Sequence, residues 1–277
     1  MPTPSTAPAP PTRARQMLNK VPEVTIYFWV IKIMCTTVGE TAADYLNVDL
    51  GFGLTKTTYV TGALLLAILA VQFRLRRYVP PAYWAVVVII SVFGTLITDN
   101  MTDHYNVALT TSTIAFSIVL AIVFAVWYAV ERTLSIHTIY TTRREAFYWL
   151  AILFTFALGT AAGDLSAEKF GLGYGVSIVI FGAMIAAVAI AHFAFKLNAV
   201  LAFWLAYILT RPLGASIGDW MSQHSHKYGG LGLGTTGTSY IFLGCILALV
   251  TYLSITRRDA TEANRPQQQR RPLADTT

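Results

Sequence analysis

One pattern, Trp-x9-Gly-x4-Asp, occurs four times in this chain, each time within an apolar stretch of helical length. The copies are Trp29/Gly39/Asp44, Trp84/Gly94/Asp99, Trp149/Gly159/Asp164 and Trp204/Gly214/Asp219. A carboxylate inside a lipid bilayer costs free energy, and ionisable side chains found there are usually functional. The recurrence of one acid at one position of four helices therefore predicts that the four carboxylates act together.

The composition around the motif is that of a multi-pass membrane protein. Of the 277 residues, 55% are hydrophobic and 12% are charged, whereas a soluble domain has about 25% charged residues. Eight stretches approach the about 20 apolar residues that cross the hydrocarbon layer. They lie near residues 22–46, 56–73, 82–102, 110–131, 145–166, 174–195, 197–221 and 234–255. The predicted fold class is all-α, a polytopic membrane bundle of eight transmembrane helices.

Basic residues gather before the first stretch, after the last one, and on every second connection between them. The groups are Arg13, Arg15 and Lys20; Arg74, Arg76 and Arg77; Arg132, Arg143 and Arg144; Lys196; and Arg257 and Arg258. Because cytoplasmic loops carry the excess of Lys and Arg, both termini are predicted to be cytoplasmic. The motif Asp residues then lie toward the outer ends of the odd-numbered spans.

The motif spacing divides the chain into two similar halves. Asp44 and Asp164 are 120 residues apart, and so are Asp99 and Asp219. The predicted division is a disordered cytoplasmic tail at 1–20, a first half with helices one to four at 21–140, a second half with helices five to eight at 141–258, and a second disordered cytoplasmic tail at 259–277.

Each half consists of two helix pairs, so the chain holds four two-helix units that all enter the membrane in the same direction. Such parallel repeats are related by axes along the membrane normal. A pseudo-fourfold arrangement would place the Asp-bearing helices inside and the even-numbered helices outside. A pseudo-twofold arrangement of the two halves fits the spacing equally well.

The segments around the four Asp residues also resemble a known family. They read VGETAADYL, FGTLITDNMTD, LGTAAGDLSAE and LGASIGDWMSQ. They are similar to bacterial multi-pass, membrane-anchored proteins built from four tandem copies of a short repeat of unknown function, and the resemblance covers roughly residues 20–258. It implies the eight-helix fold and a bacterial inner (plasma) membrane, and it implies almost nothing about activity.

One face of each odd-numbered span is found by counting in fours from the third residue after the motif Trp. The four columns are Lys32, Thr36, Glu40, Asp44; Val87, Ser91, Thr95, Asp99; Ile152, Phe156, Thr160, Asp164; and Tyr207, Arg211, Ala215, Asp219. The columns are polar mainly toward their Asp ends. They are therefore predicted to face a shared axis.

The other motif positions have structural interpretations. Small residues let membrane helices approach closely, so Gly39, Gly94, Gly159 and Gly214 are predicted to pack the inner helices, with contact to a ligand as the alternative. The motif Trp residues lie near the cytoplasmic starts of their spans and are interpreted as interfacial anchors.

The connection after each Asp is rich in glycine in three units, and the second unit has Asn106 where the others have glycine. Hydroxyl residues follow, among them Thr57 and Ser177. They are interpreted as caps of the next helix. In the alternative, the glycine backbone near the Asp residues exposes carbonyl oxygens to an ion.

The charges of the columns favour a cation. The five acids are Glu40 and the four Asp residues, the two bases are Lys32 and Arg211, and the sum is −3 if all are ionised. Rings of acidic side chains favour cations in pores, and oxygen ligands suit hard ions such as Mg²⁺, Mn²⁺ or Ca²⁺. The sequence defines no resident cofactor, and a divalent cation is the ligand it indicates.

Two functions from different classes fit these features. The first is an integral membrane cation transporter or channel for a divalent metal ion, with export favoured and a Mn²⁺-like ion among the candidates. In it the four Asp residues bind the ion, Glu40 tunes affinity or carries a proton, and Lys32 and Arg211 compensate charge or gate. The alternative is a non-transporting membrane scaffold or assembly protein whose Asp residues form hydrogen bonds between helices.

The expected partners are the lipid bilayer and the transported cation, with no nucleic acid, and the oligomeric state stays open. The sequence contains neither a His-Glu-x-x-His metal motif nor a serine nucleophile elbow. We therefore expect no enzymatic activity.

Overall fold

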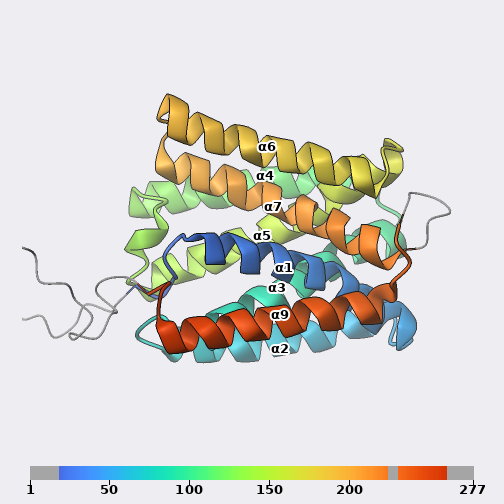
Figure 1. Cartoon of the computed structure of the whole chain (residues 1–277), viewed down its shortest axis with the longest axis horizontal. Helices are drawn as coiled ribbons and strands as arrows, with labels where there is room; N and C mark the ends of the chain where they lie inside the picture. The colour runs from blue at the N-terminus through green and yellow to red at the C-terminus, as the bar shows by residue number, and fades with distance from the viewer. Residues whose placement is uncertain (1–18, 224–229, 261–277) are drawn as a thin grey trace, which may run out of the picture.

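The computed structural model describes residues 19–223 and 230–260, and in these ranges the chain forms eight α-helices and no strand (Figure 1). They are α1 (Ile26–Asp44), α2 (Leu54–Arg74), α3 (Pro80–Asp99), α4 (Leu109–Glu131), α5 (Thr142–Asp164), α6 (Tyr174–Phe195), α7 (Ala199–Ser222) and α9 (Gly234–Thr256). The all-α class and the order of the helices are as predicted. The predicted tails lie outside the described residues, apart from 19–20 and 259–260.

Seven of these helices, all except α1, are long and apolar enough to cross a membrane. The chain thus has the helices of a membrane bundle. Helix α1 differs because it carries Lys32 and Glu40, and both side chains are buried inside the bundle. A helix enclosed by other helices can carry such residues without turning them toward lipid.

The four motif-bearing helices form a closed inner ring. Helix α1 packs against α3 and α7, and α5 also packs against α3 and α7. In α3, α5 and α7, more than half of the apolar, membrane-length segment is buried inside the bundle. In α2, α4, α6 and α9, at most 28% of the corresponding segment is buried. The structure therefore has the inside-and-outside arrangement of the pseudo-fourfold alternative.

Each outer helix packs on the inner helix of the following unit. Helix α2 lies on α3, α4 on α5, and α6 on α7, and the last outer helix, α9, lies on α1. Figure 1 shows α9 beside α1 although they come from opposite ends of the chain. The four units are thus joined in a circle, and the fourth unit closes on the first.

The motif glycines lie where neighbouring inner helices approach each other. A Cβ atom added at Gly39 would be 1.9 Å from Ser91 Oγ of α3, and one at Gly214 would be 1.7 Å from Thr36 Oγ1 of α1. Gly94 faces α5 and Gly159 faces α7 in the same way. Each glycine therefore contacts the next inner helix around the ring, which agrees with the packing interpretation.

Three inner helices change their winding at the motif Asp. Helices α1, α3 and α5 continue as five-residue π-helical turns, Tyr45–Asp49, Asn100–His104 and Leu165–Lys169. Helix α7 continues as an α-helix to Ser222. Short π-helical turns are rare and are often found at functional sites. Asp44, Asp99 and Asp164 thus stand at the junction between the two windings.

The connections that follow the π turns require left-handed backbone. Gly51 and Gly171 have φ of 65°, and Asn106, which takes their place in the second unit, has φ of 55°. Asn adopts this conformation more readily than most residues because its short polar side chain can bond locally. The second unit therefore keeps the geometry of the connection without the glycine.

The hydroxyl residues after these connections do not cap the next helices, so that interpretation was wrong. Gly53 and Gly173 are the N-terminal cap residues of α2 and α6, and neither cap has a side-chain hydrogen bond. Thr57 and Ser177 lie one turn further on, where their hydroxyls donate to the carbonyl oxygens of Gly53 and Gly173 at 2.9 Å. The glycine conformation begins each helix without help from a side chain.

The segments that flank the bundle pack over its Trp-bearing end. Lys20, expected in a disordered tail, is buried there because its Nζ donates to Glu145 Oε2 at 2.6 Å and to the carbonyl oxygen of Phe73. Asp259 is also buried, and it accepts a hydrogen bond from the Tyr78 hydroxyl at 2.5 Å. Burial and the neighbouring Asp259 raise the pKa of Tyr78, so the phenol stays a donor.

A candidate cation site on the axis of the bundle

The acid-bearing ends of the inner helices converge. One carboxylate oxygen each from Glu40, Asp164 and Asp219 lies within 4.8 Å of the others. The carboxylates of Asp44 and Asp99 are close enough to Glu40 and to each other for electrostatic repulsion. The structure thus gathers three of the five predicted acids into one cluster, called the triad below, and places the other two beside it.

The triad lies at the edge of the buried core. The side chain of Glu40 is 8% exposed and Asp219 is 7% exposed, while the other three motif Asp residues are partly buried. The layers beneath them, away from the Asp end, are completely buried. The motif Asp residues are therefore less enclosed than the layers beneath them.

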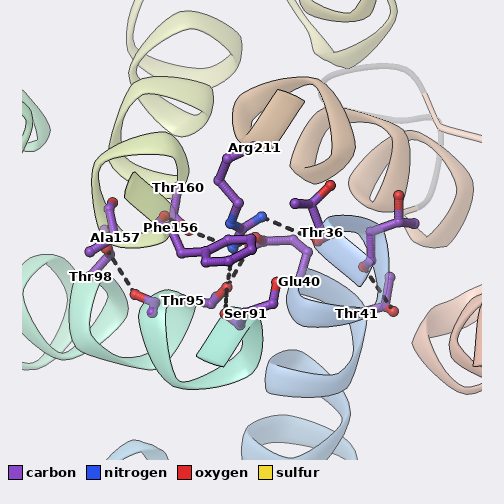
Figure 2. Close-up of polar contacts among 12 residues, drawn as sticks. Thr36, Glu40, Thr41, Ser91, Thr95, Thr98, Phe156, Ala157, Thr160 and Arg211 are labelled. Carbon is purple, nitrogen blue, oxygen red and sulfur yellow. Dashed lines mark hydrogen bonds and ion pairs between the residues drawn. The ribbon is translucent and has the colours of Figure 1, made fainter. Parts of the chain in front are cut away.

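None of the four motif carboxylates accepts a hydrogen bond from the described residues, and hydroxyl groups make the interhelical bonds nearby instead. Thr98 Oγ1 of α3 donates to the carbonyl oxygen of Ala157 of α5 at 3.0 Å (Figure 2). Ser239 Oγ of α9 donates to Thr41 Oγ1 of α1 at 2.7 Å. The interhelical role that the scaffold alternative gives to the Asp residues is thus filled by other side chains within these ranges.

Three further acids lie near Asp44, and sequence reasoning did not single them out. Asp49, Asp103 and Glu168 lie in the π turns and are close enough to Asp44 to repel it electrostatically. With the five acids of the columns, they make eight of the chain's 14 acidic residues. Asp103 and Glu168 both follow their motif Asp by four residues, a repetition that could have indicated them.

Arg211 lies in the centre of the ring, beside Glu40 of the triad (Figure 2). Its Nη2 donates to Glu40 Oε2 at 3.1 Å, to Thr160 Oγ1 at 2.7 Å and to the Thr95 hydroxyl. Its Nη1 donates to the carbonyl oxygen of Thr36 at 3.2 Å. The guanidinium is completely buried and is held by acceptors from α1, α3 and α5, while its own backbone belongs to α7.

Two neighbours make room for this arginine. A Cβ atom at Gly159 would be 2.2 Å from Arg211 Cγ, so the stem passes through the space that the glycine leaves. The guanidinium carbon is 5.6 Å from the centre of the Phe156 ring. The positive charge of Arg211 is thus stabilised by one carboxylate, three neutral oxygens and an aromatic face.

Lys32 lies one helical turn below Thr36 and does not pair with Glu40. Its Nζ donates to the carbonyl oxygen of Tyr207 at 2.9 Å and to the Thr210 hydroxyl. The same atom is 4.0 Å from the centre of the Tyr207 ring. Of the two predicted charge-compensating bases, Arg211 is therefore the one that meets an acid of the cluster.

The axis is closed below Lys32. Val87, Ile152 and Tyr207 are completely buried at the level of Lys32, and aromatic side chains fill the next level toward the Trp end: Phe28, Tyr83, Tyr148 and Phe203. The hydroxyls of Tyr83 and Tyr148 are 2.5 Å apart. In the described residues the axis is thus filled by packed side chains from Lys32 to the Trp end.

Three of the four motif Trp residues pack with these aromatic side chains near the Trp end of the bundle. Trp84, Trp149 and Trp204 are between 2% and 4% exposed. Trp84 packs edge-on against Tyr83, and Trp204 against Trp127. The interpretation as interfacial anchors was therefore wrong for these three, because the inner helices turn them into the core of the bundle and away from lipid.

Comparison with known proteins agrees with the repeat found in the sequence and in the ring. The family model described as Repeat of Unknown Function (DUF347) matches four times, at residues 27–78, 82–133, 147–198 and 202–259. Each match holds one inner helix and the outer helix that follows it. No curated protein and no solved structure matches the chain. Since the four matches cover more than half of its length, the chain belongs to the family of proteins built from this repeat.

Proposed function

We propose that the protein transports a divalent cation across a membrane through the axis of its inner ring. The observation that carries the proposal is the triad: oxygens of Glu40, Asp164 and Asp219 lie within 4.8 Å of one another at the Asp end of a closed helix ring. Like charges at such separations repel strongly where water is scarce. A bound cation relieves this repulsion.

The chemistry of the triad favours a hard divalent ion. All three side chains offer carboxylate oxygens, the ligands of Mg²⁺, Mn²⁺ and Ca²⁺. No Cys or His belongs to the triad, whereas soft ions select thiolate and imidazole groups. We use Mn²⁺ as the test ion.

The surroundings suit delivery and release of such an ion. The acids of the π turns, Asp49, Asp103 and Glu168, add negative charge near Asp44. Acidic clefts raise the local concentration of cations and speed their association. With both termini cytoplasmic, as the loop charges predict, the acidic end of the ring would face outward. We favour export as the direction, with Glu40 tuning the affinity of the site.

The test is Mn²⁺ flux into proteoliposomes that contain a Mn²⁺-quenched dye. Asp164→Asn and Asp219→Asn remove charge from the triad and are expected to lower the flux at least tenfold. Asp44→Asn and Asp99→Asn lie outside the triad and should lower it less. Glu23→Gln, a partly exposed acid before α1, is the matched control and should leave the flux unchanged.

Thermal stability in detergent is measured on the same variants. Undiminished flux in all four Asp variants would remove the transport role from these residues. A wild-type protein without flux, combined with melting temperatures lowered in the Asp variants and not in the control, would instead support the scaffold alternative.

A further inference from the structure

We infer that Arg211 is a built-in competitor of the transported ion, which sets the charge of the site and holds Glu40 when no metal does. The inference rests on the proposed function and assigns a regulatory role within the same site. It starts from geometry: Arg211 Nη2 is 3.1 Å from Glu40 Oε2, and Glu40 is one of the three triad acids. A metal ion on Glu40 and the guanidinium therefore compete for one carboxylate.

The neutral contacts of Arg211 allow it to yield Glu40 without leaving the axis. Thr160 Oγ1, the Thr95 hydroxyl and the carbonyl oxygen of Thr36 all accept hydrogen bonds from the guanidinium. These acceptors come from three helices, and only the Thr95 hydroxyl also bonds Glu40, to whose Oε2 it donates at 3.4 Å. The guanidinium can thus stay in place beside the triad while the carboxylate turns toward a metal ion.

The charge count gives the arrangement a selective effect. The three carboxylates of the triad carry −3, and the guanidinium reduces this to −2. Asp44 and Asp99 beside the triad add further negative charge, so the guanidinium lowers the negative charge of the site by one without neutralising it. In a buried site, an uncompensated charge is costly. Loss of Arg211 therefore makes the site more negative and favours ions of higher charge, La³⁺ more than Mn²⁺.

The same competition explains how the site can be without a metal ion. Three unpaired carboxylates close together resist burial. With Arg211 on Glu40, part of this charge is compensated, so the ring can close around the triad with no transported ion bound. Loss of Arg211 should consequently strengthen ion binding and slow the return of the ion-free protein.

The first experiment measures Mn²⁺ and La³⁺ binding to purified full-length protein by titration calorimetry and thermal shift. Arg211→Gln removes the competitor and should raise Mn²⁺ affinity about tenfold, with a larger gain for La³⁺. Arg211→Lys keeps the charge and should stay within about threefold of the wild type for both ions. Arg143→Gln, at an exposed arginine in the first turn of α5, is the matched control and should behave as the wild type.

The second experiment compares two kinds of flux. Arg211→Gln should slow net Mn²⁺ entry into metal-free proteoliposomes at least tenfold while it preserves exchange of Mn²⁺ across the membrane. Arg211→Lys should preserve both. Equal loss of net flux and exchange, or unchanged Mn²⁺ and La³⁺ affinities in a folded Arg211→Gln protein, would overturn the inference.

A measurement on the wild type guards against misfolding of Arg211→Gln. In protein labelled with ¹⁵N at arginine Nε, the Arg211 signal, identified by its loss in Arg211→Lys, should shift saturably as Ca²⁺ is added. A signal that stays fixed while Ca²⁺ raises the melting temperature would overturn the inference and leave the proposed function intact. No binding of Mn²⁺ or Ca²⁺ to the wild type would overturn both.

Discussion

On the axis of the bundle, glycine residues leave space for polar side chains of the neighbouring helix. Gly159 of α5 leaves the space through which the stem of Arg211 passes. Gly39 and Gly214 do the same for Ser91 and Thr36. Lipid gives helices little reason to associate through apolar burial alone, so close approach at small residues stabilises the ring through dispersion contacts and hydrogen bonds. The motif glycine is therefore a condition for the polar axis.

At this scale we expect Gly214→Ala to destabilise the protein. The new Cβ would lie 1.7 Å from Thr36 Oγ1 and 3.0 Å from the backbone oxygen of Ile33, so α1 and α7 must move apart. Overpacking of this kind lowers the free energy of unfolding by roughly 1–3 kcal/mol. Thermal unfolding in detergent measures it, with Gly182→Ala on the outer helix α6 as control, since an added Cβ meets nothing there. Equal melting temperatures of the two variants would contradict this account.

At the scale of elements, the π turns place a second set of acids near the first. If α1 continued past Asp44 as an α-helix, its diameter would stay the same. The π turn Tyr45–Asp49 instead widens the helix directly after the motif Asp. The left-handed residues that follow reverse the chain toward the outer helix. Three units repeat this order of π turn and chain reversal, and short π turns of this kind are frequent at functional sites.

Substitutions at Asn106 test whether the chain reversal between α3 and α4 requires a left-handed backbone conformation. Asn106→Gly should change the free energy of unfolding by less than about 1 kcal/mol, because glycine occupies the same position in the first and third units. Asn106→Val should destabilise by about 1–2 kcal/mol, because a β-branched residue is strained at φ of 55°. Chemical unfolding of both variants measures the difference. A valine variant as stable as the glycine variant would show that the left-handed conformation is not required.

Several elements could be predicted from the sequence because their signals are local. Apolar length and motif spacing predicted the helices, with the inner position of the odd-numbered ones as one of two alternatives, and the columns in fours predicted that Arg211 and Glu40 face the axis. Other features depend on contacts that spacing does not encode. Trp84 near the end of a span fits an interface as well as a core, and the partner of Glu40 follows from helix rotation. The packing of α9 on α1 joins segments from opposite ends of the chain.

At the scale of the whole molecule, the units form a circle in which chain connectivity is interrupted once. The interruption lies between α9 and α1, which nevertheless pack together. There the backbone N–H of Glu23 donates to the carbonyl oxygen of Asp259 at 2.9 Å, so the two ends of the described chain are adjacent. The connection between α2 and α3, by comparison, exposes Arg76 and Arg77.

A circular permutant should therefore fold. We propose a chain that begins at Arg77, continues to residue 260, joins residue 19 through a short Gly/Ser linker, and ends at Arg76. Its inner ring contains the same contacts, so its melting temperature should stay within about 10 °C of a control that consists of residues 19–260 in the native order. Loss of a cooperative transition in the permutant, with the control folded, would show that the order of the units matters.

Joining four units in one chain has a consequence for what can stand on the axis. A homotetramer of single units would place any axial side chain there in four copies, and four guanidinium groups facing one another would repel. Covalent fusion lifts that constraint, because each unit can diverge alone. One arginine, one lysine and one glutamate can then share a centre that strict symmetry would forbid.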